Sequence, residues 1–248
     1  MRKLLISSAF LPLMSNLLPF TTADGSLSFR NIAFDEMYHT KSGAREESFE
    51  KHARPIKVWE KENPVIYDIC FGLGYNAAAA IDLIRQNGNK SLITIYIFEN
   101  DLEILKRIPE INAEFDSFPL IQGVIRTFID TYQKNNPIHS NKNYYEQFYK
   151  QENIKFIMLL GDARKTILEA KESADFVFFD PFSPTHHSEM WGLSFIKDVY
   201  SKMNFGGKLT TYSYARIVRE TFAAAGFNVI AGPIIGRKSP STIAIKEV

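Results

Sequence analysis

Hydrophobic positions along the chain fall into two recurring patterns. Short continuous apolar runs, typical of buried strands, alternate with stretches whose apolar residues recur every three or four positions, as in amphipathic helices. Because the two alternate, the pattern predicts an open, mostly parallel α/β sheet with helices on both faces. The runs predict strands over 64–71, 91–100, 154–163, 174–182, 206–213, 227–232 and 241–248, and the periodic stretches predict helices over 43–61, 76–88, 118–132, 190–203 and 215–226.

Composition limits the class of protein. A chain of 248 residues with 45% hydrophobic content suits one domain with a sizeable core, which we expect over residues 22–248. The formal net charge is +1, but residues 197–248 carry eight Lys or Arg against three Asp or Glu. This excess favours either an anionic partner or a solvated surface. Cys70 is the only cysteine, which excludes an internal disulfide and a zinc cluster.

The first residues allow more than one interpretation. "MRKLLISSAFLPLM" has a basic tip and an apolar stretch, as signal peptides have, but no small-residue cleavage site follows it. We expect residues 1–21 to form a short arm, with Met14 as an alternative start. No apolar run reaches the length of a membrane span, so we expect a cytoplasmic protein that does not contact membrane.

The stretch "YDICFGLGYNAA", residues 67–78, places a glycine turn between a predicted strand and a predicted helix. Gly72, Gly74 and Ala77 have the spacing of a dinucleotide fingerprint, which many S-adenosylmethionine enzymes share. Asp68 favours the second ligand, because a carboxylate there would repel a pyrophosphate and suit an ammonium group; the alternative is that it caps a turn. We expect Gly74→Val to fill the space the ligand needs and to abolish binding without unfolding the domain.

Other acids follow the next predicted strands. Glu99 ends one of them and could accept both ribose hydroxyls of either kind of cofactor. Asp162 ends the next and could pair with an adenine edge, or cap the helix predicted over 163–171. Since ligands bind at the carboxyl ends of strands in such sheets, these positions predict one site.

Asp180 comes at the end of a further apolar strand, in "FVFFDPFSP". Pro181 and Pro184 restrict the backbone of the loop that leaves this strand, with Phe182 between them. An aromatic ring beside a carboxylate could stack on a base while the acid holds an amine. The structural alternative is a capped turn over the sheet.

The stretch "THHSEMW", residues 185–191, holds His186, His187 and Glu189. Adjacent histidines in a loop usually point apart and no further ligands cluster nearby, so we expect no metal. Trp191 is either a core aromatic or a wall on which a base stacks. The other histidines are isolated and expected to be structural: His39, His52 and His139.

Longer motifs resemble the MnmC-type methyltransferases of tRNA wobble-uridine modification. The resemblance runs from "TADGSLSF" to the end and includes "FDEMYHTKSGAREES", "DICFGLGYNA", "FFDPFSP" followed by "EMW", "TTYSYARIVRETFAAAGF" and "GRK". It implies a Rossmann-like methyltransferase fold, S-adenosyl-L-methionine as co-substrate, and as acceptor the amine of 5-aminomethyl-(2-thio)uridine in tRNA. "THHSEMW" departs from the family's usual Lys/Asn-Pro-rich run, on the acceptor side.

The resemblance also implies roles for residues. Asp180 would face the acceptor amine as the catalytic residue. The cofactor site would comprise Glu47, Asp68, Gly72, Gly74, Glu99, Asp162 and Ala163, and the substrate side Phe182, Pro184, Trp191, Arg216, Arg237 and Lys238. The chain has no room for the FAD-dependent oxidase domain of bifunctional relatives, so it resembles the stand-alone form, without FAD or metal, and another enzyme would make the aminomethyl intermediate.

Other functions remain open from the residues. One is a transferase acting on another amine, including an aminopropyl transferase that uses decarboxylated S-adenosylmethionine. Another is a non-catalytic RNA-binding module with the same fold. An NAD(P) oxidoreductase is disfavoured by Asp68.

Overall fold

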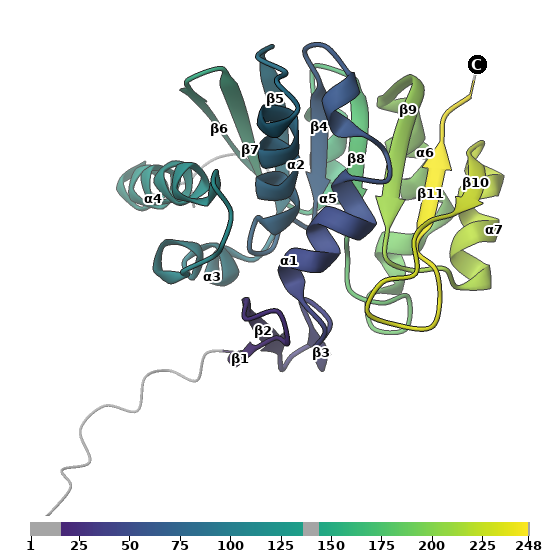
Figure 1. Cartoon of the computed structure of the whole chain (residues 1–248), viewed down its shortest axis with the longest axis horizontal. Coiled ribbons are helices and arrows are strands. Elements are labelled where there is room, and N and C mark those ends of the chain that lie inside the picture. Colours follow the sequence, from purple (N-terminus) through teal and green to yellow (C-terminus); the bar gives the residue numbers. More distant parts are fainter. Residues whose placement is uncertain (1–15, 136–143, 248) are drawn as a thin grey trace, which may run out of the picture.

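An eight-stranded sheet runs through the centre of the computed structural model, which describes residues 16–135 and 144–247 (Figure 1). The strand order is β10-β11-β9-β8-β4-β5-β7-β6. The strands are β4 (Val65–Ile69), β5 (Ile93–Glu99), β6 (Tyr144–Gln151), β7 (Ile154–Gly161), β8 (Ala174–Phe179), β9 (Met203–Thr211), β10 (Asn228–Ala231) and β11 (Thr242–Ile245).

The inner strands pair in parallel and the outer ones antiparallel. β4 pairs in parallel with β5 and β8, β5 with β7, and β8 with β9. The outer strands β6, β10 and β11 run antiparallel to their neighbours. This confirms the predicted mostly parallel α/β sheet and brings the carboxyl ends of the inner strands to one edge, where ligands bind in such folds.

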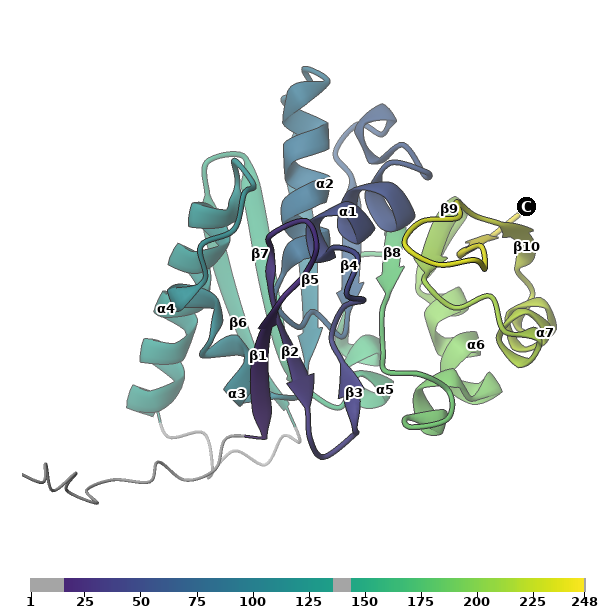
Figure 2. The same cartoon turned by 60° about the horizontal axis from the view of Figure 1, so that its bottom comes forward.

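Helices cover both faces of the sheet (Figures 1 and 2). One hydrophobic cluster packs α2 and α4 against one face, and another packs α5, α6 and α7 against the other. None of the helices within 16–135 and 144–247 has the length and apolar content needed to cross a membrane. The helices are α2 (Tyr75–Gln86), α3 (Leu102–Leu105), α4 (Phe118–Asn135), α5 (Ala163–Thr166), α6 (Leu193–Ser201) and α7 (Arg216–Ala225), with short 3₁₀ turns η3 (Ile108–Glu110), η5 (Ile167–Glu169) and η6 (Ser188–Trp191).

A second, small sheet precedes the central one (Figure 2). β1 (Leu17–Thr21), β2 (Leu27–Asn31) and β3 (Glu36–Met37) form an antiparallel meander. The sequence pattern did not predict these strands: it assigned residues 17–21 to an arm, and residues 1–15 with Met14 lie outside the described part. β6 was also not predicted.

The helix predicted over 43–61 is divided into different kinds of turn. It comprises α1 (Ala44–Glu47), the π-helix η1 (Ser48–Ala53) and the 3₁₀ turn η2 (Val58–Glu60). The amide of Arg54 donates to the carbonyl of Phe49 at 2.9 Å, which is the wide spacing of a π-helix. Such turns are rare and frequently lie at functional sites.

The glycine turn between β4 and α2 corrects one expectation. Gly74 begins α2 with φ 79°, and a Cβ added there would lie 2.6 Å from Cζ of Phe71 and 3.2 Å from Cγ2 of Ile121. Gly74 therefore faces the core. A larger side chain would disturb packing rather than fill ligand space, so Gly74→Val is not the clean test of binding that the sequence suggested.

We predict that Gly74→Ala lowers the free energy of unfolding by about 2–4 kcal/mol. Part of this loss comes from placing alanine in a left-handed backbone conformation, and part from overpacking the core. Gly88→Ala is the matched control, because Gly88 has φ 75° but no atom within 4 Å of the added Cβ. It should cost about 1 kcal/mol. Urea unfolding followed by circular dichroism measures both, and equal losses would contradict the clash with Phe71.

Candidate functional site

A cleft opens at the carboxyl edge of the central sheet. Its floor comes from the segments that follow β4, β5, β8 and β9, including Cys70, Glu99 and Asp180. Its roof comes from residues 36–40 and from Arg237 in the loop before β11. The cleft therefore lies where the strand-end acids predicted it, but residues from before the first strand of the central sheet close it.

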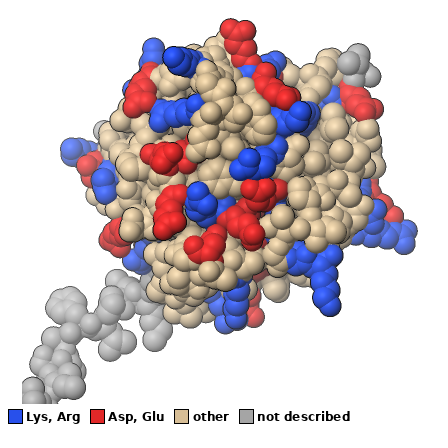
Figure 3. All heavy atoms as spheres, viewed as in Figure 1, with Lys and Arg blue, Asp and Glu red and all other residues tan. Residues whose placement is uncertain are grey.

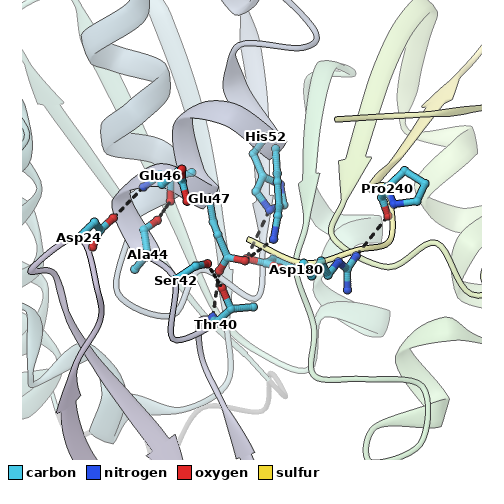
Figure 4. A network of polar contacts seen from close by, with 12 residues as sticks. Asp24, Thr40, Ser42, Ala44, Glu46, Glu47, His52, Asp180 and Pro240 are labelled. Atoms are coloured by element: carbon cyan, nitrogen blue, oxygen red, sulfur yellow. Dashed lines mark hydrogen bonds and ion pairs between the residues drawn. The ribbon is translucent and has the colours of Figure 1, made fainter. Parts of the chain in front are cut away.

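Asp180 lies at the centre of a polar network (Figure 4). Its amide donates to the carbonyl of Ile69 at 3.1 Å, and its side chain is 16% exposed. Nδ2 of Asn76 donates to Oδ2 at 3.1 Å, and Nε2 of His52 lies 3.8 Å from the same oxygen. Burial raises the pKa of the Asp180 carboxyl to about 6, and nearby Glu47 adds to the rise. The group can therefore change protonation close to neutral pH.

Glu99 connects two of the loops in the floor. Oε2 accepts the amide of Gly72 at 2.8 Å, and Oε1 accepts the amides of Asn100 at 2.8 Å and Asp101 at 2.9 Å. The hydroxyl of Tyr38 donates to Oδ2 of Asp101 at 3.3 Å. Burial raises the pKa of Glu99 although these three amides oppose the rise. The carboxylate thus fixes the glycine turn beside the end of β5.

Asp68 does not line the cleft. It is fully buried in β4, and neither carboxylate oxygen has a hydrogen bond of normal geometry to a described residue. Burial, together with the nearby carboxylates of Asp180 and Glu99, raises its pKa well above the ordinary range. The sequence argument assumed a charged Asp68 facing the ligand; in the structure the side chain is fully buried, does not line the cleft, and has a pKa raised by that burial.

Glu47 holds the roof to the cleft wall. Oε2 accepts the amide of Thr40 at 3.0 Å, and Oε1 forms an ion pair with Lys51, which is 1% exposed (Figure 4). Despite burial, Lys51 holds the pKa of Glu47 below its usual value. Glu47 is therefore a charged wall residue within the cleft.

Aromatic rings gather around the loop after β8. The ring of Phe182 lies 5.0 Å from those of Phe34 and Tyr38. Trp191 lies in the core instead, 5% exposed, and its Nε1 donates to the carbonyl of Phe182 at 2.8 Å. Trp191 therefore does not supply a stacking wall in the cleft; it anchors the loop that carries Phe182.

The two loop histidines point to different partners. Nδ1 of His186 lies 3.1 Å from Oε2 of Glu36, which also accepts the amide of Ser183 at 2.9 Å. His187 lies against Phe34 and lines the cleft. Among residues 16–135 and 144–247, no group of three or more His, Cys, Asp or Glu is arranged to hold a metal.

Several expected residues lie outside the cleft lining. Asp162 caps α5 by accepting the amide of Arg164 at 3.0 Å, as its capping interpretation predicted. Arg216 lies exposed on α7 and pairs with Glu220 at 2.6 Å. The other expected residues that do not line the cleft are Gly72, Gly74, Ala163, Pro184 and Lys238.

The sequence analysis missed residues that the fold brings to the cleft. His39 and His52 were expected to be structural, yet both line the cleft, and burial lowers the pKa of each imidazole. Asn76 follows the glycine turn and was read only as part of a helix. Asn76 is 5% exposed in α2, which is buried on nearly all sides, and nothing in the sequence pattern marked it. His139, which was also expected to be structural, lies outside the described residues.

Comparison with known proteins identifies similar chains. A family model described as S-adenosyl-L-methionine-dependent methyltransferase matches residues 125–247. The uncharacterized protein MJ0670 of Methanocaldococcus jannaschii is 30% identical over 226 residues, which cover 91% of this chain and 58% of that protein. The tRNA 5-methylaminomethyl-2-thiouridine biosynthesis bifunctional protein MnmC of Leptospira borgpetersenii is 28% identical over 178 residues, covering 71% and 26%. The chain thus spans less than two thirds of these relatives.

Solved structures agree with these matches. MnmC2 from Aquifex aeolicus superposes with a TM-score of 0.73 at 30% identity, covering 96% of this chain and 72% of that one. Spermidine synthase from Thermotoga maritima superposes with a TM-score of 0.55 at 12% identity, covering 94% and 69%, which shows a shared fold alone.

We predict that Asp180→Asn stabilises the fold at pH 7 by about 2–3 kcal/mol. The carboxyl pKa rises from 3.8 to about 6 on folding, so its ionisation destabilises the folded state. The advantage of the variant should be absent below pH 3.8, grow as pH rises, and become constant above about 6. Urea unfolding at pH 5 and pH 7 measures this. If the free energies of unfolding of the variant and the unaltered protein differ by the same amount at both pH values, the raised pKa is contradicted.

Proposed function

This chain belongs to the MnmC-type family of S-adenosyl-L-methionine-dependent methyltransferases, and we propose that it methylates the amine of 5-aminomethyl-(2-thio)uridine at the tRNA wobble position. The observation that carries the proposal is Asp180, a carboxylate with a pKa of about 6 at the end of β8, beside the aromatic ring of Phe182. A carboxylate next to an aromatic ring suits an amine attached to a base.

The acidic lining of the cleft suits a sulfonium co-substrate. Acidic side chains outnumber cationic ones along its lining: Glu36, Glu47, Glu99, Asp101 and Asp180 against Arg237. Such a lining attracts a ligand with positive charge and no phosphate. A Cβ at Gly72 would meet the ring of Tyr38 at 3.3 Å, so a larger residue behind the lining would press on Tyr38, which does line the cleft. Bound there, S-adenosyl-L-methionine supplies an electrophilic methyl group.

The chain's own residues act on the acceptor. A nitrogen attacks the methyl carbon as the carbon–sulfur bond breaks, so positive charge moves from sulfur to nitrogen. The nitrogen must be neutral first, and an alkylammonium has a pKa of roughly 10. Asp180, ionised above pH 6, accepts an N–H of the amine, aligns its lone pair and stabilises the growing charge. The proton that the nitrogen releases passes to Asp180 or to solvent.

A second acceptor class is favoured by the acid-rich lining. Polyamines are cations, and a carboxylate-lined cleft attracts them for the same physical reason as the donor. The surface charge does not distinguish a tRNA acceptor from a polyamine acceptor, because cationic and anionic side chains are interspersed over the face in Figure 3 and no single sign dominates it. The distinction requires an assay with both acceptors.

The deciding experiment incubates the protein with methyl-labelled S-adenosylmethionine and either tRNA that carries 5-aminomethyluridine or spermidine. We expect label only in the methylaminomethyl nucleoside after digestion of the tRNA. Label in spermidine alone would replace this function with the polyamine one, and donor binding without any transfer would favour a non-catalytic RNA-binding module. We place the reaction in the cytoplasm, downstream of a separate enzyme that forms the aminomethyl group, without FAD or metal in this chain.

Asp180→Asn keeps the volume of the side chain and removes its charge. We predict that the methylation rate falls by roughly 10²–10⁴, the scale of a positioned acid–base or electrostatic group. Donor affinity, measured by calorimetry, should change little because Asp180 faces the acceptor. A variant with an unchanged single-turnover rate would remove Asp180 from the chemistry.

Arg237 and Lys238 are the proposed phosphate contacts. Arg237 lies over the ring of Tyr212 at 5.4 Å at the cleft, and Lys238 is exposed beside it. We predict that replacing both with Ala weakens tRNA binding. The slope of log affinity against log salt should become shallower by the contribution of about two phosphate contacts. Arg85→Ala with Lys90→Ala is the matched control at the far end of α2. Equal slopes for the two double variants would exclude this loop, leaving Arg216 as the next candidate.

A further inference from the structure

The two oxygens of Asp180 differ in their surroundings. Oδ2 receives the N–H of Asn76 at 3.1 Å and faces Nε2 of His52 at 3.8 Å. No residue within 16–135 and 144–247 donates a hydrogen bond of normal geometry to Oδ1. We propose that Asn76 and His52 are positioning residues that hold Asp180 by Oδ2 and leave Oδ1 for the acceptor amine, an inference that rests on the proposed function.

His52 is itself held in one orientation. Nδ1 lies 3.2 Å from the hydroxyl of the buried Thr210, and the ring meets Phe178 edge-on with centroids 6.0 Å apart. Burial lowers the pKa of the imidazole to about 3, so it is neutral at the pH where Asp180 ionises. In the tautomer whose Nδ1 accepts the Thr210 proton, Nε2 carries the hydrogen and lies 3.8 Å from Oδ2, beyond hydrogen-bonding distance. His52 then contacts the carboxylate as a neutral side chain and does not compete for its proton.

Different elements deliver the two groups. Asn76 lies in the first turn of α2, directly after the glycine turn, and is 5% exposed. His52 lies on the π-helix η1, whose packing against β9 brings it to Thr210. A π-helix is rare, and here it places one buried side chain 3.8 Å from a carboxylate in the loop after β8. Because both partners are buried, a small displacement of either would turn the carboxylate.

Other groups also act on the charge of Asp180. His39, Lys51 and the N–H of Asn76 favour its ionised form, whereas Glu47 opposes it. Further ionisable groups face it from the neighbouring strand ends: Asp68, Cys70 and Tyr212. Removing the Asn76 donor removes one stabilising contact of the charged form, so the midpoint of Asp180 titration must move to higher pH.

The test uses Asn76→Leu, which keeps most of the volume and loses the donor. We expect the kcat for tRNA methylation to fall by about 10–10², with KM and donor affinity changing less, since a displaced group affects the transition state most. We also expect the ¹³C carboxyl resonance of Asp180 to titrate about half a unit to one unit higher, the scale of one lost hydrogen bond. The acid limb of the pH–rate profile should move with it.

His52 is tested by a pair of variants. His52→Leu removes the N–H that faces Oδ2, whereas His52→Gln retains an N–H at a similar reach. We expect Gln to restore most of the kcat that Leu loses. Asn87→Ala is the control, because its amide donates to Leu83 at the other end of α2, far from the cleft, and its kcat should equal that of the unaltered protein.

The outcomes separate the two proposals. An Asp180 titration that is unchanged in Asn76→Leu, or equal kcat values for His52→Leu and His52→Gln, would overturn the positioning roles. If the unaltered protein methylates no tRNA, the proposed function fails, while the carboxyl titration still decides whether Asn76 holds Asp180. Where a leucine variant fails to fold, Asn76→Ala or His52→Ala, with its thermal midpoint measured, replaces it in the same comparison.

Discussion

Burying carboxylates at one edge of a sheet is the constraint on which this structure depends. The parallel strands bring their acidic ends together, and each charge that leaves water must be compensated. Glu99 is compensated by three backbone amides, and Glu47 by the buried ammonium of Lys51. Asp180 is compensated only in part, and the carboxylate oxygens of Asp68 accept no hydrogen bond of normal geometry from any described residue. The pKa values follow the same order. The pKa of Asp68, which has the least compensation, is well above its ordinary range, and the pKa of Asp180 is about 6.

Under the proposed function, incomplete compensation would give the cleft its selectivity. The acidic side chains Asp180 and Glu99 give the cleft a negative potential. This potential is offset only because the pKa of each carboxyl group is raised. A ligand that carries or develops positive charge would compensate this negative charge. The raised pKa of Asp180 means that its ionised form destabilises the fold as long as no such ligand is bound. The same argument explains why a phosphate would fit poorly against the floor and why Arg237, the only Lys or Arg among the described residues that line the cleft, lies in the roof.

The sequence predicted the central sheet and missed what surrounds it. Strands such as β5 are buried on both faces and therefore read as continuous apolar runs. β1 is a short edge strand, LLPFT, that contains a proline, and β6 is an outer strand that combines polar and apolar residues, so neither has a clear strand pattern. Asp180 and Glu99 could be found because position at a strand end is visible in a sequence. The partners of Asp180 could not, because His52 reaches it only when a π-helix far away in the chain packs against β9.

The roof couples the two halves of the cleft through one short segment. Glu36 accepts the amide of Ser183 in the loop after Asp180, while Tyr38, two residues on, donates to Asp101 after β5. A Cβ at Gly236 would fall 2.1 Å from the hydroxyl of Ser42, so the loop that carries Arg237 also lies against this segment. A ligand bound on the Asp101 side of the cleft would therefore affect contacts on the Asp180 side, and the reverse. Because hydrogen bonds to a carboxylate strengthen as water leaves, closing this shared roof would strengthen the hold on donor and acceptor together.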